Sequence, residues 1–170
     1  MHIEHPKRPL AKLLITSLLL MGAAGQSFAE WKVGDALPDL TAFKLEGKLP
    51  DCSNKVLMVD FWASWCTPCA QSFPAMDSLQ KKYGEQGFQI IAINVDENRT
   101  AMEKFLKKSP AAFAVVRDAS QQLVEKAGVS TMPGSFIVDR AGKVRFVHSG
   151  FNGKKTEKQY EIEIESLLKK

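Results

Sequence analysis

Two of the three cysteines, Cys66 and Cys69, form a C-x-x-C motif, and this pattern indicates chemistry more directly than any other in the sequence. Cysteines at this spacing at the start of a helix can close a small ring, so they can switch between dithiol and disulfide with little backbone movement. Pro68 suits the first turn of a helix, where no backbone donor is needed. The motif is therefore predicted to open a helix that runs to about Tyr83 and ends at Gly84.

The two cysteines are expected to differ in reactivity. Cys66 lies at the predicted helix N-terminus, where unpaired backbone donors and the macrodipole favour an anion. Its thiolate should form at lower pH and attack a substrate disulfide. Cys69 lies one turn further in and should be more buried. It would resolve the mixed disulfide by attacking Cys66.

Two other interpretations of the motif are open. A zinc half-site would need two further ligands, and beyond residue 29 only Cys52 and His148 supply another cysteine or histidine. A static structural disulfide is the second interpretation, because an oxidising compartment permits one. The residues around the motif favour redox chemistry over both, so neither a metal nor a cofactor is expected.

The first 29 residues have the layout of an export signal. Basic residues precede an apolar stretch at 13–25, and Ser27-Phe28-Ala29 places small residues where a signal peptidase reads them. Cleavage is predicted between Ala29 and Glu30, which gives a soluble periplasmic protein. An uncleaved membrane anchor is less favoured, because the apolar stretch is shorter than the ~20 residues that span a bilayer.

The composition fits a single soluble domain over residues 30–170. The chain has 170 residues, of which 45% are hydrophobic and 25% are charged. Residues 1–29 hold three of the 23 basic and one of the 19 acidic residues, so the remainder carries a net charge of only +2. This weak, dispersed charge does not indicate nucleic-acid binding. Three cysteines form no disulfide framework, and we expect a monomer.

Strand and helix patterns alternate along this domain and end in a hairpin and a helix. Strands are predicted at 56–62, 88–95, 112–116, 135–138 and 143–148, and helices at 66–83, 99–108, 120–127 and 154–168. This order predicts a mixed sheet with helices on both faces. The turn-rich segment 30–55 is predicted to be an irregular extension with a hairpin.

These motifs resemble a known family. Residues 60–69 (DFWASWCTPC) are closely similar to the active-site segment of thioredoxins, and Thr131-Met132-Pro133 resembles their cis-proline loop. The N-terminal extension and the segment 98–116 resemble those of secreted thioredoxin-like disulfide reductases of the TlpA/ResA type. The resemblance covers about residues 34–165. It implies an α/β thioredoxin fold, with an insertion before the cis-proline loop, and a thiol–disulfide oxidoreductase.

The resemblance also implies residue roles around substrate. Pro133 would be cis and packed against the cysteine pair, although the residues alone would favour a simple turn there. Met132 would then bind an extended substrate strand through its backbone. Trp65 would form part of an exposed apolar docking patch, and Thr67 and Pro68 would contact substrate beside it.

Asp60 matches the buried aspartate of thioredoxins. A carboxylate in an apolar strand should have a raised pKa, so Asp60 could take a proton from Cys69, directly or through water. The alternative is an aspartate at a strand end that reaches solvent. Trp62, two residues on, fits the core as well as it fits the site.

Two residues depart from a simple assignment. Many TlpA/ResA-type proteins carry a glutamate three residues after the second cysteine, where this chain has Ser72. This weakens a narrow assignment to cytochrome c maturation. Cys52 lies outside the motif, and a passive free thiol is favoured over transient pairing with Cys66.

The favoured function is reduction of disulfides in exported proteins. Thr67 and Pro68 add no positive charge between the cysteines, so the Cys66 thiolate should not be stabilised as strongly as in an oxidant. A reductant in an oxidising compartment would need a membrane-embedded thiol electron donor. The alternatives are a disulfide oxidase or isomerase, and a non-enzymatic chaperone or electron-relay module.

Overall fold

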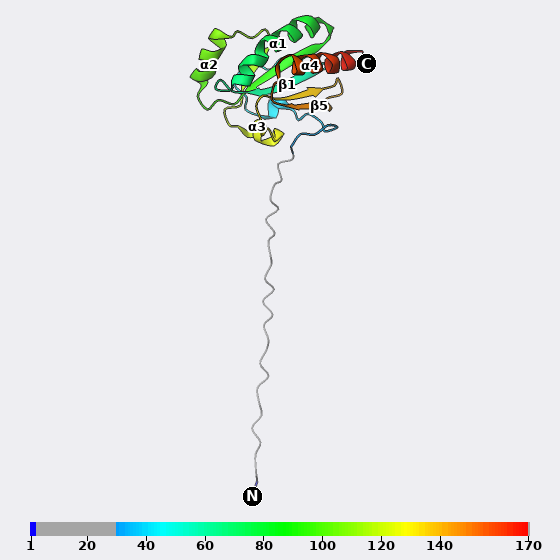
Figure 1. Cartoon of the computed structure of the whole chain (residues 1–170). Coiled ribbons are helices and arrows are strands. Elements are labelled where there is room, and N and C mark those ends of the chain that lie inside the picture. The colour runs from blue at the N-terminus through cyan, green and yellow to red at the C-terminus, as the bar shows by residue number, and fades with distance from the viewer. Residues whose placement is uncertain (3–29, 170) are drawn as a thin grey trace.

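The computed structural model describes residues 1–2 and 30–169 (Figure 1). The predicted export signal therefore lies outside the described residues except for its first two. Five strands form one sheet: β1 (Val56–Trp62), β2 (Phe88–Asn94), β3 (Ala114–Arg117), β4 (Gly134–Val138) and β5 (Val144–Ser149). They follow the order β3-β2-β1-β4-β5. β1, β2 and β3 run parallel, and β4 and β5 are antiparallel to their neighbours, so the predicted mixed sheet is confirmed.

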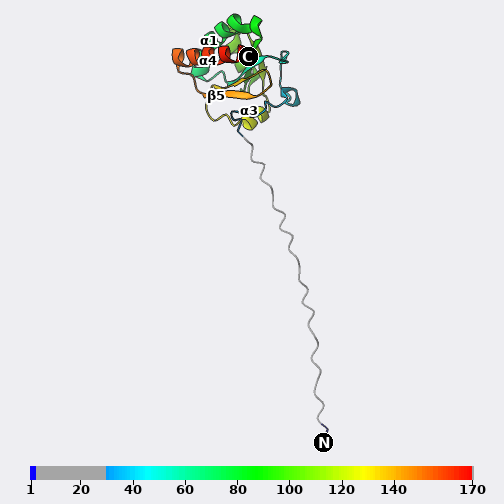
Figure 2. The ribbon, with the colours of Figure 1, turned by 90° about the vertical axis from the view of Figure 1, so that its right-hand side faces the viewer.

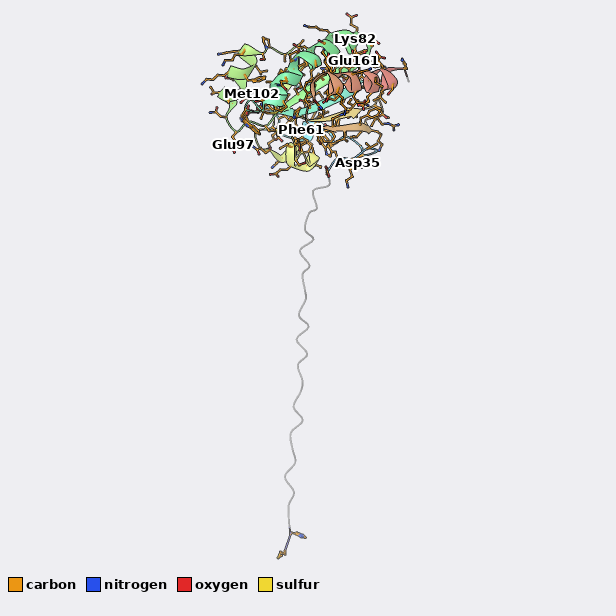
Figure 3. All side chains as sticks on the ribbon, viewed as in Figure 1. Asp35, Phe61, Lys82, Glu97, Met102 and Glu161 are labelled. Atoms are coloured by element: carbon orange, nitrogen blue, oxygen red, sulfur yellow. A yellow bond between two sulfur atoms is a disulfide. The ribbon has the colours of Figure 1, made fainter. Side chains whose placement is uncertain are left out.

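The helices cover both faces of the sheet. They are α1 (Thr67–Tyr83), α2 (Arg99–Lys108), α3 (Gln122–Ala127) and α4 (Gly153–Leu168), with 3-10 turns at Leu40–Ala42 and Gly84–Gln86. Two views at right angles place α1 and α4 together on one face and α3 on the other (Figures 1 and 2). Lys82 of α1 and Glu161 of α4 form an ion pair at 3.0 Å on the outer surface (Figure 3). This is the thioredoxin-like α/β fold that the resemblance implies.

Side chains of the central strand β1 point alternately toward the two helical layers. All seven of its residues are buried, as expected for a strand covered on both sides. Trp62 packs against Phe73 of α1, whereas Phe61 packs on the other face against Phe136. Because successive side chains of a strand alternate between faces, Asp60 lies on the α1 side with Trp62.

The N-terminal extension does not form the predicted hairpin within the described residues. It pairs instead with distant parts of the domain, through isolated bridges from Ala36 to Lys143 and from Glu46 to Arg117. The Arg117 guanidinium donates to both carboxylate oxygens of Glu46, at 2.9 and 3.0 Å. Trp31 is buried in the domain core. At Glu46 the extension therefore pairs with the edge strand β3.

The start of α3 also differs from the prediction. The helix begins at Gln122 rather than at residue 120, and Gln121 before it has a left-handed backbone with φ of 57°. The Asp118 carboxylate accepts hydrogen bonds from the backbone N–H groups of Leu123 and Val124, at 2.8 and 3.0 Å. Asp118 thus satisfies donors at the helix start from outside the usual cap position, and the segment before Gln122 is a turn.

Candidate active site

The Cys66–Cys69 disulfide lies at the N-terminus of α1. Cys66 is the N-cap residue, and its Sγ accepts a hydrogen bond from the Cys69 backbone N–H at 3.2 Å. Pro68 lies in the first turn, as predicted. Cys69 is fully buried, whereas Cys66 keeps a small exposed fraction of 6%. The helix start therefore offers Cys66 a backbone donor and limited access, and it shields Cys69.

The loop before β4 contains the predicted cis-proline. The Met132–Pro133 peptide bond is cis, and the Pro133 carbonyl accepts a hydrogen bond from the Gly150 N–H at 2.7 Å. No hydrogen bond joins the Met132 backbone to another described residue.

Most of the predicted contact residues surround Cys66. A cleft of about 460 Å³ is lined by Cys66 together with Trp65, Thr67, Pro68, Val129, Ser130 and Met132. Trp65 is 73% exposed, as expected for a docking residue. Val129 and Ser130 were not predicted as site residues, and their only sequence signal is that they precede Pro133.

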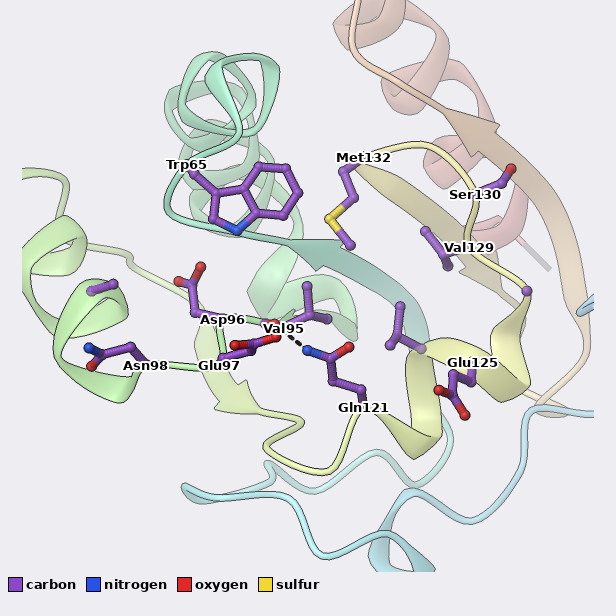
Figure 4. Close-up of a pocket in the computed structure, with 13 residues that line it drawn as sticks. Trp65, Val95, Asp96, Glu97, Asn98, Gln121, Glu125, Val129, Ser130 and Met132 are labelled. Atoms are coloured by element: carbon purple, nitrogen blue, oxygen red, sulfur yellow. Dashed lines mark hydrogen bonds between the residues drawn. The ribbon is translucent and has the colours of Figure 1, made fainter.

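A larger groove of about 820 Å³ continues from Trp65 and Met132 (Figure 4). Its apolar side includes Val95, Val124 and Val129. Its polar residues are Asp96, Glu97, Asn98, Gln121, Glu125 and Ser130. No sequence pattern indicates this groove, because its walls come from three segments that the fold brings together.

Asp60 is buried in the middle of the sheet rather than exposed at a strand end. It pairs in register with Ala92 of β2 and with Ser135 of β4. Burial raises the pKa of its carboxyl from 3.8 to about 7, and a hydrogen bond from Ser135 partly opposes that rise. Ser135 Oγ donates to Asp60 Oδ1 at 2.6 Å, whereas Oδ2 has no hydrogen-bond partner among the described residues. The carboxyl can therefore gain or lose a proton near neutral pH.

Ser72 and Trp62 are both buried, but they have different roles. Ser72 is buried, and its hydroxyl donates to the Cys69 carbonyl at 2.9 Å. It therefore bonds to the backbone of the helix turn that carries the resolving cysteine. Trp62 is fully buried against Phe73 and Phe105, so it belongs to the core and not to the docking patch.

Cys52 and His148 have partners of other kinds. The Cys52 thiol is half-buried and donates to the Pro50 carbonyl at 3.3 Å, and burial raises its pKa. A raised pKa disfavours the reactive thiolate. His148 Nε2 lies 2.6 Å from Glu163 Oε2. Within the described part of the chain, no three His, Cys, Asp or Glu side chains are placed to share a metal ion.

None of the described helices is both long and apolar enough to cross a bilayer. The site consists of a helix-start disulfide pair and a cis-proline loop that border one cleft, together with a buried acid on the α1 side of the sheet. This combination on a thioredoxin-like sheet defines a thiol–disulfide oxidoreductase.

Comparison with known proteins places the chain in a family. The Redoxin family model matches residues 32–164, and the chain belongs to the Redoxin family. It is 35% identical to the thiol-disulfide oxidoreductase ResA of Geobacillus thermodenitrificans over 131 residues, which is 75% of each chain. It is 33% identical to ResA of Bacillus thuringiensis subsp. konkukian, covering 96% of this chain and 97% of the relative.

A solved structure shows the same fold. A Chlorobium tepidum protein assigned as the thiol:disulfide interchange protein DsbE superposes with a TM-score of 0.76 at 42% sequence identity. The match covers 82% of this chain and 99% of that chain. Together, these relatives are consistent with the redox site built from the residues above.

Proposed function

We propose that this protein reduces disulfide bonds in exported proteins with its reduced Cys66–Cys69 pair. The observation that carries the proposal is the position of the pair at a helix start, facing a cleft bordered by Trp65 and Met132. An exposed tryptophan beside a reactive sulfur gives a protein substrate an apolar surface to dock on. A purely structural disulfide would need no such cleft.

The reaction transfers two electrons to the substrate in two exchanges. The Cys66 thiolate attacks one substrate sulfur, which forms a mixed disulfide and releases the other substrate sulfur as a thiolate. The Cys69 thiolate then attacks Cys66 Sγ, which breaks the mixed disulfide and releases the second substrate thiolate. The substrate is reduced to a dithiol, and the Cys66–Cys69 disulfide is formed.

Asp60 serves as the proton acceptor for Cys69 in the second exchange. Its buried carboxyl has a pKa of about 7, so it can accept a proton near neutral pH, and Oδ2 has no described hydrogen-bond partner. Since a thiol attacks only as the thiolate, removal of the Cys69 proton allows resolution. The proton moves directly or through a water molecule.

Substrate binding uses the cis-proline loop. The Met132 backbone has no hydrogen-bond partner among the described residues, so it can pair with an extended substrate segment by strand addition. Trp65, Thr67 and Pro68 border the same cleft and complete the contact surface. A segment bound in this way would bring its cysteine sulfur to Cys66.

The proposed setting is the periplasm, after removal of residues 1–29. An oxidising compartment has no soluble pool that would reduce the pair again, so we propose a membrane-embedded thiol protein as the electron donor. That donor would dock on the cleft residues that also receive substrate. Because Ser72 stands where many related reductases have a glutamate, we propose exported disulfide proteins in general as substrates rather than one maturation pathway.

Trapping experiments test this function. With Cys69→Ser, the first exchange proceeds and the second cannot, so mixed disulfides through Cys66 should accumulate with a disulfide-containing protein. Cys66→Ser should trap nothing and have no reductase activity, and Cys52→Ser should behave like the unmodified protein. If Cys69→Ser traps nothing and Cys69 proves to be the more reactive thiol, the assigned roles are wrong.

A further inference from the structure

Three polar residues lie in one row across the sheet beneath α4. Asp60 of β1 pairs in register with Ser135 of β4, and Ser135 pairs in register with His148 of β5. Tyr160 of α4 covers this row: its hydroxyl lies 2.9 Å from Ser135 Oγ, and its ring packs edge-on against His148 with ring centroids 4.9 Å apart. Side chains of β4 and α4 thus meet at the buried acid of β1, which lies about 75 residues before β4 in the sequence.

The hydrogen-bond direction in this row follows from the chemistry of its atoms. Ser135 has one hydroxyl proton and donates it to Asp60 Oδ1 at 2.6 Å. When Asp60 is ionised, the Ser135 oxygen therefore accepts from the Tyr160 hydroxyl. The hydrogen-bond chain therefore runs from the Tyr160 hydroxyl through the Ser135 hydroxyl to the Asp60 carboxylate. All three side chains are buried, so the two hydroxyls bond to the carboxylate in a setting where unpaired charge is strongly disfavoured.

We propose that Ser135 and Tyr160 are positioning residues of the redox site. Through Oδ1 they hold the Asp60 carboxyl so that Oδ2 is free to receive the Cys69 proton, and they stabilise the ionised acid without a cationic partner. This inference rests on the proposed function, in which Asp60 is the proton acceptor. It adds two hydroxyl groups that do not contact the reacting sulfurs.

Within the described residues, the neighbouring elements do not provide a cation to stabilise the ionised Asp60 carboxyl, so the two hydroxyls have this role. β2 places uncharged Ala92 opposite it. On β5 and α4, His148 Nε2 lies 2.6 Å from Glu163 Oε2, and the His148 ring packs against Tyr160.

Tyr160 keeps its proton at neutral pH. Burial, and then the negative charge on Asp60, raise the pKa of its hydroxyl, so it remains a hydrogen-bond donor in the working pH range. The edge-on contact with His148 also fixes the ring orientation. Tyr160 is therefore a permanent donor to Ser135, and its removal should be felt at Asp60 through one intermediate hydroxyl.

The expected change in the Asp60 pKa is larger when the Ser135 hydroxyl is removed than when the Tyr160 hydroxyl is removed. Ser135→Ala removes the direct donor to the carboxylate and should raise the Asp60 pKa by about 1 to 2 pH units. Tyr160→Phe removes only the second hydroxyl and should raise it by less than about one unit. In both variants, the pH profile of mixed-disulfide resolution should shift to higher pH together with the Asp60 pKa. Ser135→Thr keeps a hydroxyl at this position, so its profile should match that of the unmodified protein.

The test combines an NMR titration of the Asp60 carboxyl with the rate of resolution between pH 5 and pH 9. Tyr83→Phe is the matched control for tyrosine, since the Tyr83 hydroxyl bonds to Glu165 away from the site. Ser166→Ala is the control for serine, since that hydroxyl donates to the Glu163 carbonyl within α4. Both controls should leave the Asp60 pKa and the resolution profile unchanged.

The outcomes separate this inference from the proposed function. An Asp60 pKa unchanged in both Ser135→Ala and Tyr160→Phe overturns the hydroxyl chain. A shifted pKa with an unshifted resolution profile overturns its role in the reaction. The proposed function is tested separately by Asp60→Asn: if that variant resolves the mixed disulfide at the normal rate, Asp60 is not the proton acceptor, whatever the hydroxyls do to its pKa.

Discussion

The buried carboxyl of Asp60 should make the folded protein less stable as the pH rises. Its pKa is about 7 in the folded protein, against an ordinary value of 3.8 that applies to the unfolded chain. This difference corresponds to roughly 4 kcal/mol, at about 1.4 kcal/mol for each pH unit. Asp60→Asn removes the ionisation and should remove this pH dependence.

The direction of this pH dependence follows from the pKa values of Asp60 in the unfolded and folded states. Below about pH 3.8 the carboxyl is protonated in both states, and the stability that its raised pKa provides is fully present. Between about 3.8 and 7 the unfolded chain has lost the proton while the folded protein keeps it, so the free energy of unfolding falls as pH rises. Above about pH 7 the loss is complete and the curve levels off.

Denaturant unfolding of the oxidised protein at pH 4, 6 and 8 measures this effect. Relative to the unmodified protein, Asp60→Asn should gain up to about 4 kcal/mol between pH 4 and pH 8. The buried Asn amide introduces a donor without a described partner, which costs about 1–3 kcal/mol at every pH and does not alter the trend. Exposed Glu85→Gln is the control and should follow the unmodified protein. If the free energies of unfolding of Asp60→Asn and the unmodified protein differ by the same amount at all three pH values, the reasoning is refuted.

Three further results are expected. Trp65→Ala should lower kcat/KM for a protein disulfide about tenfold while the free energy of unfolding stays within about 0.5 kcal/mol, because Trp65 is exposed; a large loss of stability would contradict a docking role. Arg117→Ala should destabilise the fold by about 2–3 kcal/mol in denaturant unfolding, because it removes the bonds to Glu46 and to the Asp96 and Glu97 carbonyls. Glu46→Gln should cost less, because it keeps the two carbonyl bonds; equal losses would contradict this account. The intact mass of the exported protein should correspond to a chain that begins at Glu30, and a mass that includes residues 1–29 would indicate an anchor.

The regular elements could be predicted because their patterns are local. The strand at 56–62 and the helix at 99–108 match the structure at both ends, and the other strands and helices differ from prediction by at most two residues at each end. A continuous apolar run and a helical spacing of apolar residues are visible within a few residues of sequence. The C-x-x-C motif was equally local, and its placement at a helix start followed from Pro68.

Features that depend on distant contacts could not be predicted. The extension was expected to form a hairpin, but its partners are Lys143 and Arg117, about 70 to 110 residues further along the chain. The sequence around Ser135 gives no sign that its hydroxyl joins Asp60 to Tyr160, since only the sheet register and α4 bring them together. The burial of Asp60 was anticipated from its apolar neighbours, while its hydrogen-bond partners were not.

The reduction potential of the Cys66–Cys69 pair tests the central claim most directly. It is measured by equilibrating the protein with glutathione buffers of known ratio and quantifying the oxidised fraction. With a backbone donor as the described stabiliser of Cys66 and no charge on Thr67 or Pro68, the potential should lie near the ~−270 mV of thioredoxin. A potential near the ~−120 mV of a strong oxidant, with rapid oxidation of a reduced unfolded protein, would contradict the reductase and indicate an oxidase.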